Sequence, residues 1–401
     1  MTGSLTARSL VAVPAAALAG ILLGALVVVQ PIVSVGVAAV VLAAALAFTA
    51  PVANLVLLVF LSAIVPYELQ NELSVGGGPG SPGLLPSDLL LLCGLASSMF
   101  LLSDRVLDRR RLLVTGIVAL VLVVALLQFL HGLNMGAYPS DAGFEFRSLL
   151  GLGAFFLALP LLSDAVTRRR LLKSLLGLAI LLGLWGIVQW IGHFDFSPHA
   201  DFGVREGVAG ATEGRGQLTG GMYWYPIAII TCYAALLSGA ITSFATRVAL
   251  TTAVLLNAIS LFLTYERTIW LGSAVALALV TLRAKGAHRL RALLAAPIVV
   301  LLLAVVVATV APREWTAARE RLLAARQYET DNSLLQRIEE VRRVSVEIEE
   351  RPLAGSGLGA TMFFSAPEVY IEPHARLYVH NTYLWLAWKI GIPATLLLVL
   401  L

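Results

Sequence analysis

Long runs of Leu, Val and Ala recur along the chain, separated by short polar connections. Several runs reach the ~20 residues that an α-helix needs to cross ~30 Å of hydrocarbon. They do not alternate between apolar and polar positions, so they predict helices rather than the strands of a barrel. The pattern predicts an all-α polytopic membrane protein with about twelve transmembrane helices. The expected spans are residues 10–29, 31–48, 51–65, 88–103, 112–131, 148–163, 171–192, 222–240, 248–264, 268–283, 292–311 and 381–401.

These spans predict three regions. Residues 1–311 form a membrane domain with eleven transmembrane helices, residues 312–380 form one large external loop, and residues 381–401 form a last transmembrane helix that we expect to be truncated. Apolar residues recur at helical spacing in the loop, which predicts an amphipathic helix that packs on the bundle or lies on the membrane surface. These apolar residues are Leu334, Ile338, Val341, Val344 and Ile348.

Composition supports the membrane assignment. The 401 residues are 59% hydrophobic and 13% charged, whereas soluble domains carry roughly a quarter charged residues. The net charge of +4 comes from short basic clusters between apolar runs, so it indicates membrane orientation and contact with membrane lipids rather than nucleic acid. Cys93 and Cys232 both lie inside apolar runs, which predicts neither a disulfide framework nor a zinc site.

The distribution of basic residues predicts the orientation. If the N-terminus is cytoplasmic, fourteen Arg and Lys residues flank the inner ends of the spans, while four arginines lie in short outer loops. This excess obeys the positive-inside rule and places the long 312–380 loop outside the cytoplasm. The rule leaves the four outer arginines unexplained: Arg147, Arg205, Arg215 and Arg267.

Two of these arginines lie in positions suited to an anionic ligand. Arg215 follows Gly214 deep in the polar 193–221 loop, and Arg267 lies in the very short turn between two spans. The planar guanidinium binds phosphate oxygens with two parallel hydrogen bonds and keeps its charge. The alternative is interfacial snorkelling or a salt bridge, of Arg267 with Glu266 or of Arg215 with Glu213.

The third external feature is where the long loop enters the last span. His380 stands there beside Asn381, between Tyr378 and Tyr383. An imidazole titrates near neutral pH and can serve as a general base, although an aromatic anchor at the membrane interface is the alternative. Upstream, residues 355–359 (GSGLG) follow a helix and a proline rather than a strand, so we expect a tight loop that lets backbone approach a partner closely rather than a nucleotide site.

Together these segments resemble the O-antigen ligase and polymerase superfamily over roughly residues 140–401. The resemblance rests on residues 351–359 (RPLAGSGLG), 380–384 (HNTYL) and 391–392 (GI), on 267–272 (RTIWLG), on Arg215 with Gly220 or Gly221, and on Arg147 at the start of a span. The chain departs from the family pattern at Glu266, where serine is usual, at Lys389, where an acid is common, and at residues 222–225 (MYWY), where an asparagine often stands.

The resemblance implies a fold like that of the GT-C glycosyltransferases and an inverting, metal-independent enzyme without a cofactor, in the bacterial inner membrane with its active face periplasmic. It would move a glycan from undecaprenyl diphosphate to a sugar hydroxyl on lipid A–core or another surface polysaccharide. His380, Arg267 and Arg215 would be catalytic. The residues expected to bind substrate are Arg147, Asn381, Tyr383, Gly355 and Gly357.

Three alternatives stay open at this stage. A polymerase of the same superfamily would use another lipid-linked repeat as acceptor. A metal-dependent membrane glycosyltransferase usually has a carboxylate in its first external loop, whereas this chain has Gln30-Pro31 there. A lipid-linked glycan transporter usually has ionisable or helix-breaking sites near the midplane, whereas these spans offer mainly Asn54, Gln128, Gln189 and Asn257. Lys389, near one end of its span, would favour transport if it faced a cavity.

Overall fold

The computed structural model shows a mostly helical protein and describes several ranges of its residues. The described residues are 31–65, 67–74, 83–102, 109–192, 223–264, 266–290, 292–294, 304–305, 308–309, 312, 315–316, 319, 332–366 and 371–400.

Apolar helices dominate the described part of the chain. Four helical stretches there are long and apolar enough to cross a membrane: Leu112–Asn134, Pro139–Ser163, Ala165–Ile191 and Phe244–Leu263. Several shorter apolar helices accompany them, and many of their large apolar side chains face outward. Because a soluble surface rarely exposes so much contiguous apolar area, the chain is an integral membrane protein.

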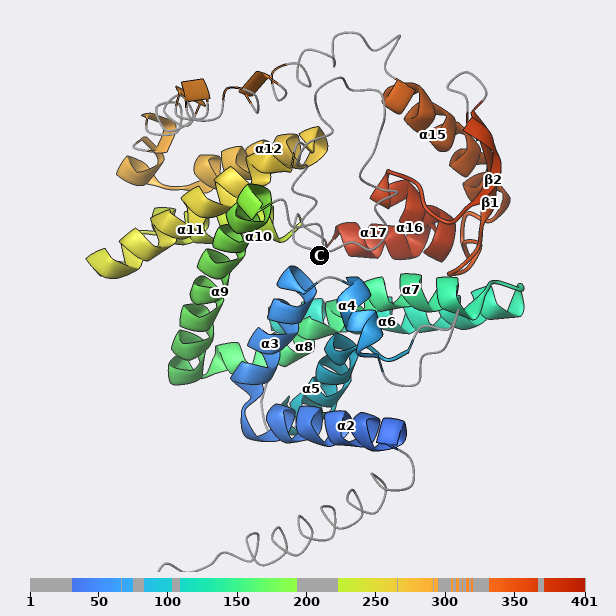
Figure 1. Cartoon of the computed structure of the whole chain (residues 1–401), viewed down its shortest axis with the longest axis horizontal. Coiled ribbons are helices and arrows are strands. Elements are labelled where there is room, and N and C mark those ends of the chain that lie inside the picture. Colours follow the sequence, from blue (N-terminus) through green and yellow to red (C-terminus); the bar gives the residue numbers. More distant parts are fainter. Residues whose placement is uncertain are drawn as a thin grey trace, which may run out of the picture.

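The N-terminal half consists of the helices coloured from blue to green in Figure 1. Its helices are α2 (Pro31–Thr49), α3 (Pro51–Ile64), α4 (Tyr67–Glu72), α5 (Pro86–Leu102), α6 (Arg109–Asn134), α7 (Pro139–Leu150), the short 3₁₀ turn η1 (Gly151–Gly153), α8 (Ala154–Ser163) and α9 (Ala165–Gly192). Proline begins several of these helices, where its missing N–H costs no intrahelical bond. Buried leucines of α3, α5 and α8 form a common core with Ala43 of α2 and Leu171 of α9.

A second group of helices packs along α9. It consists of α10 (Trp224–Leu237), α11 (Phe244–Leu263) and α12 (Arg267–Arg283). Asn257 of α11 donates to the carbonyl of Ala179, and Ser260 donates to that of Gly183, so buried polar groups fix the register of α11 against α9.

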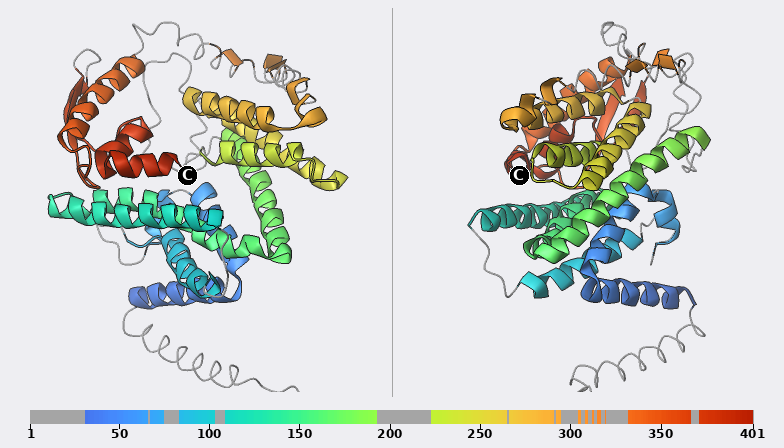
Figure 2. Two further views of the ribbon diagram at one scale, coloured as in Figure 1. Left: turned by 180° about the vertical axis from the view of Figure 1, so that it is seen from behind. Right: turned by 90° about the vertical axis from the view of Figure 1, so that its left-hand side faces the viewer.

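The C-terminal segment forms a compact unit that lies against α6 and α7 (Figures 1 and 2). It contains the amphipathic helix α15 (Asn332–Glu350), the antiparallel hairpin β1 (Met362–Ala366) and β2 (Ile371–Arg376), and the short helices α16 (Thr382–Ile390) and α17 (Ile392–Val399). Val344, Phe364 and Trp388 are fully buried in its core. Val344 of α15 packs in this core, whereas Ile338 and Val341 stay exposed.

Three sequence predictions need correction. The span expected at 381–401 is broken into α16 and α17 at Gly391, whose φ of 83° no helix can contain. The span expected at 148–163 begins at Pro139, so Arg147 lies inside a helical stretch. The external loop contains a hairpin, so the fold is mostly helical rather than all-α. The span expected at 10–29 and most of 292–311 lie outside the described residues.

Candidate functional site

Two elements of the C-terminal unit bring the candidate catalytic groups together. Asn381 caps α16: its Oδ1 accepts the backbone N–H groups of Tyr383 and Leu384 at 3.0 and 3.2 Å. This cap fixes the chain at the point where His380 enters the helix. Across from it, α15 turns Glu340 inward, and 2% of that side chain is exposed.

His380 and Glu340 form a close acid–base pair. His380 Nδ1 lies 2.9 Å from both carboxylate oxygens of Glu340, and the backbone N–H of His380 donates to Glu340 Oε2 at 3.0 Å. Because a carboxylate accepts, we assign the hydrogen of the neutral ring to Nδ1, which leaves the lone pair on Nε2. This is the arrangement by which a buried carboxylate orients a general base.

The pair lines a pocket of about 390 Å³ between α15 and the start of α16. The His380 side chain is 31% exposed, so solvent and ligands reach it. Arg337, one helical turn before Glu340, lines the same pocket and forms no ion pair with a carboxylate among the described residues. The pocket thus combines a general-base geometry with a cation that no carboxylate of the described residues pairs.

Tyr378 contacts the His380 ring at one side of this pocket, and Tyr223 is a near neighbour of Tyr378. Tyr223, just before α10, lies within electrostatic range of Tyr378 and Glu266. Tyr378 shares a hydrogen bond with Thr382 of α16. The Tyr378 ring meets the His380 imidazole edge to face at 5.8 Å. Tyr223 is therefore near both Glu266, just before α12, and Tyr378, which precedes His380.

The predicted arginines have different surroundings. Arg267 begins α12 beside Glu266, and Arg215 lies outside the described residues. Arg147 forms an ion pair with the buried Asp88, with 2.8 Å between Nε and Oδ2, and its Nη2 donates to the carbonyl of Gly83 at 2.9 Å. Arg147 thus ties α7 to the start of α5, and its predicted contact with substrate stays a prediction.

The glycine loop packs against the protein's own helices. Gly355 and Gly357 have φ of 70° and 86°, which favour glycine. A Cβ on Gly357 would lie 2.7 Å from the Cα of Gly132 in α6, and a Cβ on Gly355 would lie 2.6 Å from the carbonyl oxygen of Lys389 in α16. The expected close backbone approach is therefore to α6 and α16. Substrate binding by these glycines stays a prediction.

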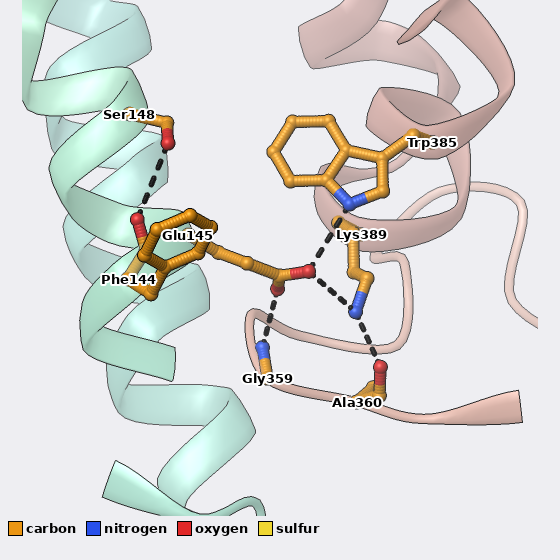
Figure 3. A network of polar contacts seen from close by, with 7 residues as sticks. All are labelled: Phe144, Glu145, Ser148, Gly359, Ala360, Trp385 and Lys389. Carbon is orange, nitrogen blue, oxygen red and sulfur yellow. Dashed lines mark hydrogen bonds and ion pairs between the residues drawn. The ribbon is translucent and has the colours of Figure 1, made fainter. Parts of the chain in front are cut away.

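A second acid–base pair lies below α16 (Figure 3). Lys389 Nζ is 2.9 Å from Glu145 Oε1, and it also donates to the carbonyl of Ala360. The same carboxylate accepts from the indole N–H of Trp385 at 3.1 Å and from the backbone N–H of Gly359 at 2.5 Å. Lys389 is completely buried, so it does not face a cavity. Lys389 therefore gives no support to the transporter alternative, which required it to face a cavity.

Residues 252–399 match the family model described as O-antigen ligase. This part of the chain is an O-antigen ligase family domain. No curated protein and no solved structure matches the chain. The domain contains α12, α15, the hairpin and α16, and with them the His380–Glu340 pair. Membership implies a membrane enzyme of polysaccharide biosynthesis that transfers glycans from lipid-linked substrates.

Sequence reasoning missed Glu340, Arg337 and Glu145. The first two share the face of α15 that also carries Val341 and Val344, so their helical spacing was a usable signal. Nothing in the local sequence marks Glu145, whose partners lie far along the chain. Within the described residues, no group of three His, Cys, Asp or Glu side chains is placed to hold a metal ion.

Proposed function

We propose that this protein transfers a glycan from undecaprenyl diphosphate to a sugar hydroxyl, with His380 as the general base. The observation that carries the proposal is the 2.9 Å contact between His380 Nδ1 and the buried Glu340. Both residues line a pocket whose wall also includes the cationic side chain of Arg337. The O-antigen ligase domain supports the substrate class. The acceptor we favour is lipid A–core or another surface polysaccharide.

The proposed reaction is a single inverting displacement. The acceptor hydroxyl gives its proton to His380 Nε2 while its oxygen attacks the anomeric carbon of the donor. The bond from that carbon to the diphosphate breaks, and the leaving diphosphate takes the electron pair. Glu340 holds the imidazole in the correct tautomer and stabilises the imidazolium that forms, as the third member of a triad does.

Arginines would neutralise the diphosphate as its negative charge grows. Arg337 lines the pocket. Arg267 begins α12, and it lies on the same external side as Arg215 in the predicted topology. Positive charge placed where charge develops stabilises the transition state more than the ground state. Arg267→Ala should therefore weaken donor binding and slow transfer, and Arg267→Lys should restore only part, because lysine lacks the planar fork.

The same groups suit a polymerase of the superfamily, in which the acceptor is a second lipid-linked glycan. Reconstitution separates the activities: a ligase joins the donor glycan to a lipid A–core or polysaccharide acceptor, whereas a polymerase extends the lipid-linked glycan itself. A transporter would change only the sidedness of the donor and would form no glycosidic bond.

We further propose about twelve transmembrane helices, with the N-terminus cytoplasmic and the His380 pocket periplasmic. The distribution of basic residues in the sequence supports this orientation. Reporter fusions after Gly78 and Tyr328 should report the outer side, and fusions after Arg170 and Lys285 the cytoplasm. A cytoplasmic signal after Tyr328 would contradict the proposal.

The test of function compares two His380 variants at checked membrane levels. His380→Ala should keep donor binding and slow transfer by about 10²–10⁴-fold, the usual contribution of a positioned general base. His380→Trp separates catalysis from anchoring, because an indole suits the membrane interface as well as an imidazole. Near-normal transfer by a well-expressed His380→Trp variant would refute the proposed base.

A further inference from the structure

An apolar groove runs along α9, α10 and α11, away from the His380 pocket. Its volume is about 510 Å³, and leucines, isoleucines and alanines of the three helices form most of its wall. On α9 it extends from Arg169 to Leu182, which at 1.5 Å per residue corresponds to about 20 Å. A groove of this length and apolar character matches a hydrocarbon chain of one leaflet, since half of the bilayer core is ~15 Å.

Both cationic residues of the groove lie at the same end. Arg169 and Lys173 are one helical turn apart on α9, and Ile241 and Thr246 lie at that end from the neighbouring elements. Both basic side chains are exposed, and neither forms an ion pair with an acidic side chain in the described part of the chain. The groove therefore ends in two positive charges that no carboxylate of the described protein neutralises.

We propose that this groove binds one anionic phospholipid, with its phosphate on Arg169 and Lys173 and an acyl chain along the apolar wall. Charge complementarity carries the inference: basic pockets between membrane helices on the cytoplasmic side suit anionic headgroups. In the orientation proposed above, the two cations lie on that side. The site is separate from glycan transfer, and its ligand comes from the inner leaflet.

The polyprenyl tail of the glycan donor is a poorer occupant. Trp224 lines the opposite end of the groove, and the adjacent Tyr223 is a neighbour of Tyr378. A donor with its diphosphate at the His380 pocket would therefore meet the groove at its Trp224 end. Arg169 and Lys173, about 20 and 14 Å from that end along α9, would face only the hydrocarbon tail of that donor.

The test is native mass spectrometry of the purified full chain with added phosphatidylglycerol or phosphatidylcholine. The protein should retain one phosphatidylglycerol in preference to phosphatidylcholine. Arg169→Gln/Lys173→Gln should weaken phosphatidylglycerol binding by about 30-fold, because each basic residue near a membrane surface strengthens the binding of an anionic lipid by roughly fivefold. Arg169→Lys keeps the charge and should retain the lipid, which separates loss of binding from loss of fold.

The matched control is Arg168→Gln/Arg283→Gln, which removes two basic residues that do not line the groove. It should bind phosphatidylglycerol as the unaltered protein does. Equal retention of the two phospholipids, or full phosphatidylglycerol binding by Arg169→Gln/Lys173→Gln, would overturn the proposal. Ala235→Phe fills the groove with a larger side chain. If this variant lost binding of undecaprenyl phosphate but kept binding of phosphatidylglycerol, the groove would hold the polyprenyl tail and the proposal would be overturned.

Discussion

Two acid–base pairs with the same N–O distance of 2.9 Å have opposite surroundings. In the Glu145–Lys389 pair both side chains are buried, with 4% and 0% exposed, and backbone and indole groups of the protein occupy the remaining bonding positions. In the Glu340–His380 pair the carboxylate is equally buried, but the imidazole is 31% exposed beside a pocket. The exposure of one partner to the pocket, rather than the distance between the two side chains, distinguishes a structural pair from a pair suited to catalysis.

The largest effect should come from breaking the buried pair. Lys389→Met leaves the Glu145 carboxylate buried without its counter-charge, which should cost about 3–5 kcal/mol of folding free energy. Thermal unfolding of the purified protein in detergent measures the loss. Glu145→Gln/Lys389→Met removes both charges and should recover a large part of that stability. An unchanged unfolding temperature for Lys389→Met would contradict the structural role.

Two arginines extend the comparison. Arg147→Gln leaves the buried Asp88 without its ion pair and should lower stability by about 2 kcal/mol. Arg337→Gln removes from the pocket a cation that forms no ion pair among the described residues, so stability should change by less than about 0.5 kcal/mol while glycan transfer slows by about 10–100-fold. Unfolding and transfer assays on both variants test this contrast. An Arg147→Gln variant that folds normally but transfers no glycan would instead support its predicted contact with substrate.

The smallest effect should come from metal removal. If arginines neutralise the diphosphate and His380 takes the proton, no negative charge remains for a divalent ion to neutralise. Transfer by the purified protein should therefore be unchanged in excess EDTA. Loss of activity that magnesium or manganese restores would revive the metal-dependent alternative.

The sequence predicted the parts of the fold that depend on composition. The apolar runs at 51–65 and 248–264 correspond to α3 and α11, because a hydrocarbon solvent leaves helix as the way to satisfy the backbone. Hydropathy does not detect a change of backbone direction inside an apolar run, so the break at Gly391 was missed. The hairpin was missed because β1 is a short apolar segment without alternation.

The candidate site could be predicted only where the signal was local. His380 stood out by its polar and aromatic neighbours, and helical spacing on α15 would have added Glu340 and Arg337. The buried pair could not be found in this way: Glu145 and Trp385, which share a hydrogen bond, are 240 residues apart. A contact of this kind depends on how helices pack, which a pattern along one segment does not contain.

The most direct test of the central claim is a double-mutant cycle on glycan transfer with His380→Ala and Glu340→Gln. If Glu340 acts through the imidazole, Glu340→Gln should slow transfer by at least about tenfold in the unaltered protein and by less than about twofold in the His380→Ala background. Donor binding, measured in parallel, should be similar in all four proteins. An equal slowing of transfer by Glu340→Gln in both backgrounds would contradict the account, because the two residues would then act independently.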